Sequence, residues 1–146
     1  MDSYIIRCST CHTANRVPAS SEGKAGRCGN CHALLRHLYT QPVALSEKSF
    51  DTFLSDFRGP VVVEFWAPWC PHCLEFEHVV RAVAKDMAGK GVIAKVNTQE
   101  NPRLAERFSI TGVPTVIVFR KGKAGERVNG AMSKQNFLAW CEKLLA

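Results

Sequence analysis

Seven cysteines dominate the chemistry that this sequence can perform. Six of them form three Cys-x-x-Cys pairs and the seventh stands alone: Cys8, Cys11, Cys28, Cys31, Cys70, Cys73 and Cys141. Structural disulfides are rare in a reducing compartment, so closely spaced cysteine pairs there indicate either thiol redox chemistry or metal binding. The residues around each pair indicate whether redox chemistry or metal binding is the more fitting use.

The pair Cys70 and Cys73 lies where an apolar run at residues 61–66 gives way to a helical pattern. We expect Cys70 at the N-terminus of that helix, where free backbone N–H groups and the helix dipole stabilise a thiolate. Pro71 fits the first helical turn, because its missing N–H would have no partner there. His72, when protonated, is a nearby cation that stabilises the thiolate further.

One helical turn separates Cys73 from Cys70, so the two sulfurs can close a small disulfide. A Cys-x-x-Cys pair at a strand-to-helix junction in a βαβ unit is typical of a redox motif. Taken alone, the pair also fits two buried core cysteines or half of a metal site. We expect His78 and Cys141 to be structural, one on a helix surface and one as a small apolar side chain.

The two N-terminal pairs have the spacing of a four-cysteine zinc site. Cys8 and Cys11 are separated from Cys28 and Cys31 by residues 12–27. Each pair can form a turn, so that four sulfurs surround one tetrahedral ion. We expect one structural Zn²⁺ at these cysteines, and iron stays open because four thiolates accept both metals.

A histidine follows each of these pairs, so His12 and His32 also complete the Cys-x-x-Cys-His pattern of c-type haem attachment. Haem attachment of this kind normally accompanies export, and the first residues lack the pattern of an export signal. Gly26, Gly29 and Asn30 favour the tight turns of a zinc site. We therefore expect zinc rather than haem, with both histidines on the surface.

Composition divides the chain into two parts. Residues 1–38 hold few large apolar side chains and are rich in Cys, His, Gly, Ser and Asn, so they need a metal to fold. Residues 39–146 alternate between strand and helix patterns, which indicates a compact α/β domain. We predict a zinc ribbon at 1–38 and a redox domain at 39–146.

The redox domain is expected to place a mixed sheet between helices. Residues 39–45 are expected to lead into a first strand, which is followed by a helix capped by Ser46 and ending near 57. A buried strand at 61–66, a helix at 70–88, a strand at 92–96 and a short helix at 102–108 come next. The chain is then expected to form a strand at 115–120, its hairpin partner at 126–129, and a last helix capped by Ser133.

The segment from residue 43 to 146 resembles the thioredoxin family. The matching motifs are Phe65-Trp-Ala-Pro-Trp-Cys70 followed by Cys73, Ala94-Lys-Val-Asn97, Gln99-Glu-Asn-Pro102, Gly112-Val-Pro-Thr115 and Asn129-Gly-Ala131. The four N-terminal cysteines are similar to the extension of the bacterial zinc-binding thioredoxin 2 subgroup. The resemblance implies an α/β thioredoxin fold, a mixed central sheet flanked by helices, with a small N-terminal zinc ribbon.

By this resemblance Cys70 is the attacking thiolate and Cys73 the resolving thiol. Glu64 stands where the family has a buried aspartate, and burial on a central strand should raise its pKa. We expect Glu64 to relay a proton to or from Cys73, with Lys95 as its charge partner. A purely structural buried ion pair is the alternative.

The resemblance also implies a substrate surface around the disulfide. Pro114 matches the family's cis-proline, which leaves the backbone of Val113 free to pair with an extended substrate. Gly112 and Gly130 should keep that surface flat, with Trp69 packed beside it. The residues expected to contact substrate are Trp69, Pro71, Gly112, Val113, Pro114 and Gly130.

One departure concerns the direction of catalysis. Pro71-His72 stands where thioredoxins have Gly-Pro, and it resembles the dipeptide of periplasmic oxidants of the same fold. Reduction potentials in this fold range from about −270 mV to about −120 mV. We expect a protein-disulfide reductase; a more oxidising isomerase or oxidant, a zinc-linked redox sensor and a chaperone module are the alternatives.

The remaining expectations concern partners and place. The net charge is +6 without any run of like charges, so a nucleic-acid partner is not favoured. No apolar run is long enough to span a bilayer, and the chain start lacks a secretory pattern, so we expect a cytoplasmic protein. The resemblance implies protein disulfides as substrates, an NADPH-linked thioredoxin reductase as partner and no organic cofactor. We expect a monomer.

Overall fold

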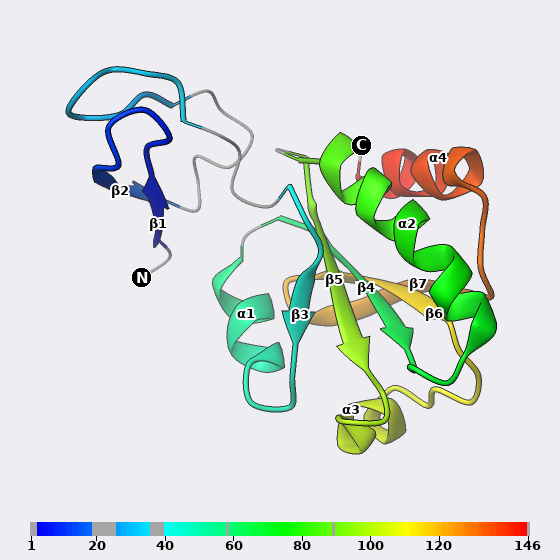
Figure 1. The fold of residues 1–146 in the computed structure, drawn as a ribbon. Coiled ribbons are helices and arrows are strands. Elements are labelled where there is room, and N and C mark those ends of the chain that lie inside the picture. Colours follow the sequence, from blue (N-terminus) through cyan, green and yellow to red (C-terminus); the bar gives the residue numbers. More distant parts are fainter. Residues whose placement is uncertain (1–2, 19–25, 36–39, 58, 89, 146) are drawn as a thin grey trace.

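The computed structural model describes residues 3–18, 26–35, 40–57, 59–88 and 90–145 (Figure 1). These residues form a two-stranded sheet near the N-terminus and a five-stranded sheet in the larger part of the chain. The predicted domain boundary between residues 38 and 39 lies outside the described residues and stays a prediction.

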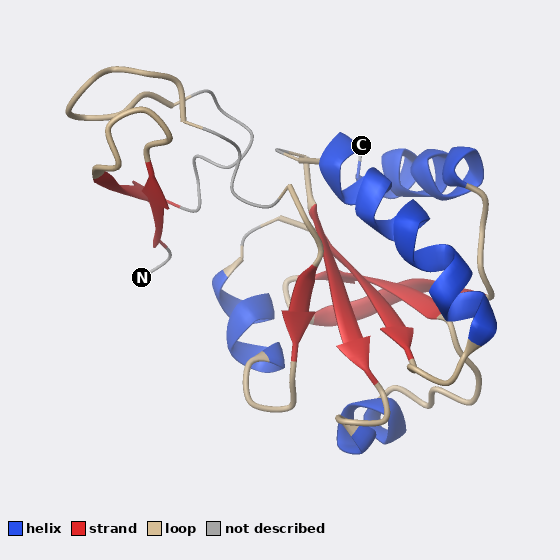
Figure 2. Ribbon diagram, in the orientation of Figure 1, coloured by secondary structure: helices blue, strands red, loops and turns tan. Residues whose placement is uncertain are grey.

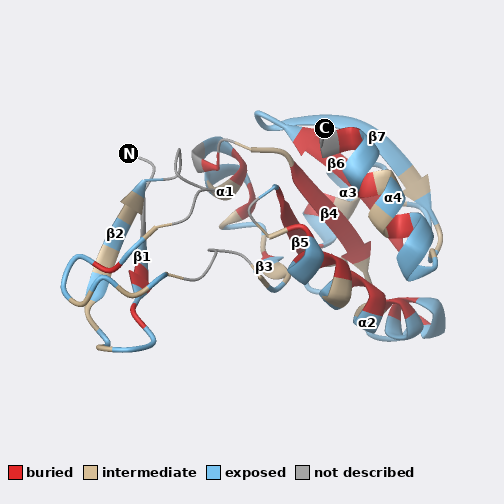
Figure 3. Cartoon of the chain, turned by 90° about the horizontal axis from the view of Figure 1, so that it is seen from above, coloured by how far each residue is buried: buried red, intermediate tan, exposed pale blue. Residues whose placement is uncertain are grey.

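The N-terminal part is built on a hairpin of β1 (Ser3–Arg7) and β2 (Ala14–Pro18), which pair antiparallel. Within residues 5–18 and 26–35, the buried side chains are those of Ile6, Cys8 and Cys28. Figure 3 shows how little of this part is buried compared with the central strands of the larger sheet. So small an apolar core agrees with the expectation that this segment needs another source of stability.

The larger sheet combines parallel and antiparallel pairing (Figure 2). In spatial order its strands are β3 (Val43–Leu45), β5 (Val92–Asn97), β4 (Val61–Trp66), β6 (Thr115–Arg120) and β7 (Lys123–Asn129). The first three are parallel to one another, while β6 and β7 run antiparallel to their neighbours. The continuous apolar run of β4 is explained by this order, because β4 is covered on both edges and both faces.

Among the described residues, four helices cover the two faces of this sheet: α1 (Phe50–Asp56), α2 (Pro71–Asp86), α3 (Pro102–Arg107) and α4 (Lys134–Leu145). One core cluster joins Phe50 of α1 and Leu104 of α3 to Val63 of β4. A second cluster joins Val80 of α2 and Phe137 of α4 to Val62 on the opposite face. The mixed sheet flanked by helices is therefore confirmed. None of the helices in the described part of the chain is long and apolar enough to cross a membrane.

Helix ends show where local prediction succeeded and where it failed. Ser133 caps α4 as predicted, because its Oγ accepts the backbone N–H of Asn136 at 3.1 Å. The predicted cap at Ser46 is wrong, since α1 begins only at Phe50. The backbone N–H of Ser46 donates to Ser49 Oγ at 2.9 Å, which closes a turn ahead of the helix. The hairpin partner of β6 begins at residue 123 rather than 126.

Candidate functional site

The redox pair lies where the predicted strand and helix meet. Cys70 is the N-cap of α2 in an extended conformation, and Pro71 occupies the first helical position. The backbone N–H of Cys73 donates to Cys70 Sγ at 3.1 Å. Each cysteine is only 3% exposed. The backbone N–H of Cys73, at the start of this helix, is thus directed at Cys70 Sγ and would stabilise negative charge on it.

The two thiols have unequal surroundings. Burial, followed by the hydrogen bond with Cys70, raises the pKa of Cys73 to about 12. The negative charges of Cys70 and Glu64 act in the same direction. Cys73 is therefore a protonated thiol at neutral pH, while Cys70 accepts a backbone N–H bond. This asymmetry suits one attacking and one waiting sulfur.

A loop at the same end of the sheet, just before β6, borders Cys70. The Val113–Pro114 peptide bond is cis, as the resemblance implied. The Cys70 thiol points at the Val113 carbonyl at 3.5 Å. Gly130 has φ +97°, a conformation that favours glycine, and its N–H donates to Pro114 O at 2.8 Å. The start of β6 and the end of β7 are thereby fixed beside the redox pair.

Glu64 lies beneath α2 as a buried acid. It is 1% exposed, and neither carboxylate oxygen has a hydrogen-bond partner among the described residues. Burial raises its pKa to about 7; Lys95 opposes the shift and Glu77 adds to it. The Lys95 ammonium lies 4.6 Å from the centroid of the Trp66 ring. Lys95 is thus close enough to act on the charge of Glu64 without a hydrogen bond to it.

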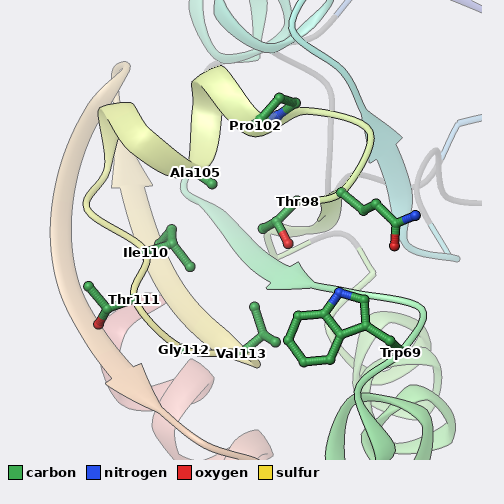
Figure 4. A pocket seen from close by; sticks show the side chains of 9 residues that line it. Trp69, Thr98, Pro102, Ala105, Ile110, Thr111, Gly112 and Val113 are labelled. Carbon is green, nitrogen blue, oxygen red and sulfur yellow. The ribbon is translucent and has the colours of Figure 1, made fainter.

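An open pocket of about 310 Å³ adjoins the redox pair (Figure 4). Trp69, which is 69% exposed, forms one wall and faces Val113. Of the predicted substrate residues, the pocket unites Trp69, Gly112 and Val113, whereas Gly130 is not part of its lining. Pro71 and His72 are exposed on the first turn of α2. The other lining residues are Thr98, Gln99, Pro102, Ala105, Ile110 and Thr111.

Sequence reasoning did not predict this second wall of the pocket. Its residues follow β5, a strand that runs parallel to β4. Ligand sites in sheets of this kind gather at the carboxyl ends of parallel strands. The position of Thr98 directly after a predicted strand was therefore the available signal.

The four N-terminal cysteines converge as predicted. Their Sγ atoms all lie within 4.8 Å of one another. Cys8 Sγ is 3.5 Å from Cys31 Sγ, and Cys11 Sγ is 3.6 Å from Cys28 Sγ. A tetrahedral ion with metal–sulfur bonds of about 2.3 Å separates its sulfurs by roughly 3.8 Å. The cluster has the donor set and nearly the spacing to hold a metal.

The two halves of this cluster are built alike. The backbone N–H of Thr10 donates to Cys8 Sγ at 3.4 Å, and that of Asn30 donates to Cys28 Sγ at 3.4 Å. Such N–H···S bonds spread the negative charge of metal-bound thiolates. Each half therefore presents its first sulfur in the same electrostatic setting.

The same duplication extends to side chains. Arg7 Nη1 donates to the carbonyl of His12 at 3.2 Å, and Arg27 Nη1 donates to the carbonyl of His32 at 3.0 Å. Both histidines have φ 64°, and both are exposed as predicted. The repeated unit is thus Arg-Cys-x-x-Cys-His, in which the arginine holds the turn behind the cysteine cluster.

Asn15 connects the two halves, a role that sequence reasoning missed. Its Nδ2 donates to Thr13 O at 3.0 Å and to Cys28 Sγ at 3.5 Å. Its Oδ1 accepts the backbone N–H of Gly29 at 2.9 Å. The sequence shows only an asparagine between the two cysteine pairs, which by itself does not indicate this role.

Comparison with known proteins agrees with the redox geometry. The family model described as thioredoxin matches residues 41–143. Thioredoxin C-3 of Corynebacterium nephridii is 33% identical over 141 residues, which cover 97% of this chain and 95% of that protein. The thioredoxin of Synechocystis sp. is 37% identical over 101 residues, covering 69% of this chain and 94% of that protein.

A chloroplastic M-type thioredoxin of Zea mays is 39% identical over 103 residues, covering 70% of this chain and 62% of that protein. The residues that the family model matches, 41–143, include all five strands of the larger sheet. With the strand-to-helix cysteine pair and the cis-proline beside it, these matches show that the chain belongs to the thioredoxin family of thiol–disulfide oxidoreductases.

Proposed function

We propose that this protein reduces disulfides of protein substrates through Cys70 and Cys73. The observation that carries the proposal is the position of Cys70 Sγ, which accepts a backbone N–H at the start of α2 and lies beside Val113 O. In the first step the Cys70 thiolate attacks one sulfur of the substrate disulfide. A mixed disulfide forms, and the other substrate sulfur leaves as a thiolate.

The second step uses Cys73. Its thiol loses a proton, and the resulting thiolate attacks Cys70 Sγ. The bond between Cys70 and the substrate breaks, and the second substrate thiolate leaves and takes up a proton. Two electrons have then passed from the dithiol to the substrate disulfide, and Cys70 is joined to Cys73.

Glu64 is our proposed acceptor of the Cys73 proton. A pKa of about 7 lets this carboxyl gain and lose a proton near neutral pH. Its charge already influences Cys73, which supports their proximity. Lys95 would favour the ionised form of Glu64 that accepts the proton.

The substrate segment is proposed to lie along the loop at Val113, with one side chain in the pocket beside Trp69. Gly112 and Gly130 offer no side chain that would obstruct it. Thioredoxins act on protein disulfides and are typically recharged by thioredoxin reductase. We propose the same NADPH-linked partner here, with no organic cofactor on this chain.

We further propose one structural Zn²⁺ at Cys8, Cys11, Cys28 and Cys31, as in the zinc-binding thioredoxin 2 subgroup. The four close sulfurs and the N–H···S bonds support this assignment. Elemental analysis of the purified chain should give one zinc per chain. One iron per chain, or a coloured protein with haem absorption, would replace the zinc proposal.

A cytoplasmic monomer is the setting we propose. The spacing of six of the seven cysteines in three Cys-x-x-Cys pairs suits redox chemistry and metal binding in a reducing compartment, which supports this setting. Gel filtration under reducing conditions should give a mass near 16.2 kDa. Elution at twice that mass would contradict the monomer.

The function is tested by reduction of a protein disulfide, insulin, with NADPH and thioredoxin reductase. Wild type and Cys141→Ser should both reduce it, because Cys141 is buried away from the redox pair between α4 and the sheet. Cys70→Ser should be inactive. Activity that survives in Cys70→Ser would refute the proposal.

The direction of catalysis is tested by equilibrating Cys70 and Cys73 with glutathione. A potential near −270 mV is the value expected of a general reductase. A value close to −120 mV would show that His72 dominates and would favour the oxidant or isomerase alternative.

A further inference from the structure

Two large exposed apolar side chains flank the redox pair. Among the described residues, the exposed large apolar side chains are Ile5, Leu34, Trp69 and Leu74. Trp69 and Leu74 stand immediately before and after the segment Cys70–Cys73. Such a concentration at one site indicates a contact surface rather than chance.

Leu74 lies one helical turn beyond Cys70 on the same side of α2. Its backbone N–H donates to the carbonyl of Cys70 at 3.1 Å, so the two residues are neighbours along the helix surface. Relative to the N-cap, Trp69 and Leu74 occupy the two positions where apolar residues often pack against each other and fix a helix start. Here Trp69 is 69% exposed and Leu74 is 54% exposed. Most of their surface is therefore not used for local packing.

The packing of α2 does not depend on Leu74 either. The helix is anchored by buried side chains on its other side, including Phe76, Val80 and Val83. The exposed apolar surface of Leu74 therefore stays in contact with water and adds nothing to the stability of the fold. A contact made only when a substrate is bound explains this exposure.

The position of Leu74 relative to Val113 defines which part of a substrate it meets. Val113 and the pocket beside Trp69 border Cys70 on the side of the cis-proline loop. Leu74 borders Cys70 on the side of α2. A substrate segment is therefore expected to lie along Val113 on one side of its reacting cysteine, which is bonded to Cys70. On the other side of that cysteine the same segment is expected to meet Leu74.

We propose that Leu74 is a specificity-determining residue that selects substrates with an apolar side chain next to the reacting cysteine, on the side facing away from Val113. This inference rests on the proposed disulfide reductase activity. An apolar substrate side chain gains from covering Leu74, because both groups leave water. A charged side chain at the same position loses its hydration against an apolar partner.

The test uses disulfide-bonded peptides that differ at one residue. One pair carries leucine or aspartate before the reacting cysteine, and a second pair carries leucine or aspartate after it. Wild type should reduce the leucine peptide of one pair about tenfold faster, in kcat/KM, than its aspartate partner. Leu74→Lys should abolish or reverse that preference, whereas Leu74→Met should keep it.

Two controls separate this inference from the proposed function. Reduction of 5,5′-dithiobis(2-nitrobenzoate), which carries no peptide, should differ by less than about twofold between wild type and Leu34→Lys. Leu34→Lys, a matched change at an exposed leucine of the N-terminal part, should leave the peptide preference intact. Failure of wild type to reduce any of these disulfides would refute the proposed function itself. Equal preference in wild type and Leu74→Lys, with full activity in both, would overturn only the role of Leu74.

Discussion

Glu64 and Lys95 are paired across β4 and β5, yet within the described part of the chain neither oxygen of Glu64 accepts a hydrogen bond. The Lys95 ammonium lies over the ring of Trp66 instead. The arrangement is therefore not a closed ion pair. The carboxyl of Glu64 is buried, and its pKa is raised mainly because water is excluded from it. Its charge therefore changes near neutral pH.

The first prediction is that Glu64→Gln changes how stability depends on pH. Glu64 ionises near its ordinary value of 4.5 in the unfolded chain and near 7 in the fold. Between these values the fold binds more protons than the unfolded chain, so the stability contributed by this group falls as pH rises. The free energy of unfolding of the variant, relative to wild type, should increase by about 3 kcal/mol from pH 4 to pH 8.

Urea denaturation of both proteins across this pH range measures the effect. Glu75→Gln is the matched control, because Glu75 is an exposed acid on α2. Its difference from wild type should stay within about 0.5 kcal/mol at every pH. A constant difference between Glu64→Gln and wild type would show that Glu64 does not have the raised pKa.

The second prediction concerns the resolving thiol. Cys73→Ser should still attack a substrate disulfide through Cys70, because the N–H bond from position 73 to Cys70 Sγ comes from the backbone. Without a second thiol the mixed disulfide cannot be released. Mass spectrometry should find substrate covalently bound to the variant and none bound to Cys70→Ser. Rapid turnover by Cys73→Ser would contradict the assigned roles.

The third prediction is that Asn15→Ala weakens the metal binding that we propose at the four N-terminal cysteines. The asparagine side chain bonds Cys28 Sγ and the backbone of Gly29, so its loss should loosen the second pair of ligands. We expect zinc release to a chromogenic chelator to become about tenfold faster. Asn136→Ala, an exposed asparagine on α4, is the control and should release zinc at the wild-type rate. Equal rates for both variants would show that Asn15 does not support the ligands.

The fourth prediction tests the cap of the last helix. Ser133→Ala removes the hydroxyl that accepts the Asn136 N–H and should lower the free energy of unfolding by about 1 kcal/mol. Ser55→Ala, at an exposed position of α1, should change it by less than about 0.5 kcal/mol. Denaturation midpoints in urea give both values. A Ser133→Ala midpoint equal to that of wild type would rule out the cap.

Much of the fold was predictable because local patterns and tertiary packing agree. The apolar run of β4 and the helical spacing after Cys70 both correspond to buried surfaces in the structure. The wrong prediction of a helix cap at Ser46 has a local cause. Ser46 and Ser49 are equally good capping residues, and the hydrogen bond between them decides in favour of a turn before the helix.

The candidate site was predictable where its chemistry is local in sequence. The spacing of the cysteines alone predicts both the redox pair and the clustering of the four N-terminal sulfurs. Ile110 could not be found in this way, and Thr98 could be found only from its position after a strand, because the order of strands rather than any motif creates the pocket. The contact of Asn15 with Gly29 is likewise a meeting of distant residues that leaves no periodic pattern.

The strand order also determines when, during synthesis of the chain, Cys70 and Cys73 can reach their folded surroundings. β4 leads directly into Cys70, but both of its neighbours in the sheet, β5 and β6, are encoded after it. On a ribosome that adds about 5–20 residues per second, β4 and Cys70 emerge roughly 3 to 10 seconds before the end of β6. The nascent chain therefore carries its reactive cysteines through synthesis before their helix terminus is anchored to a sheet, and translation itself times the appearance of the redox activity.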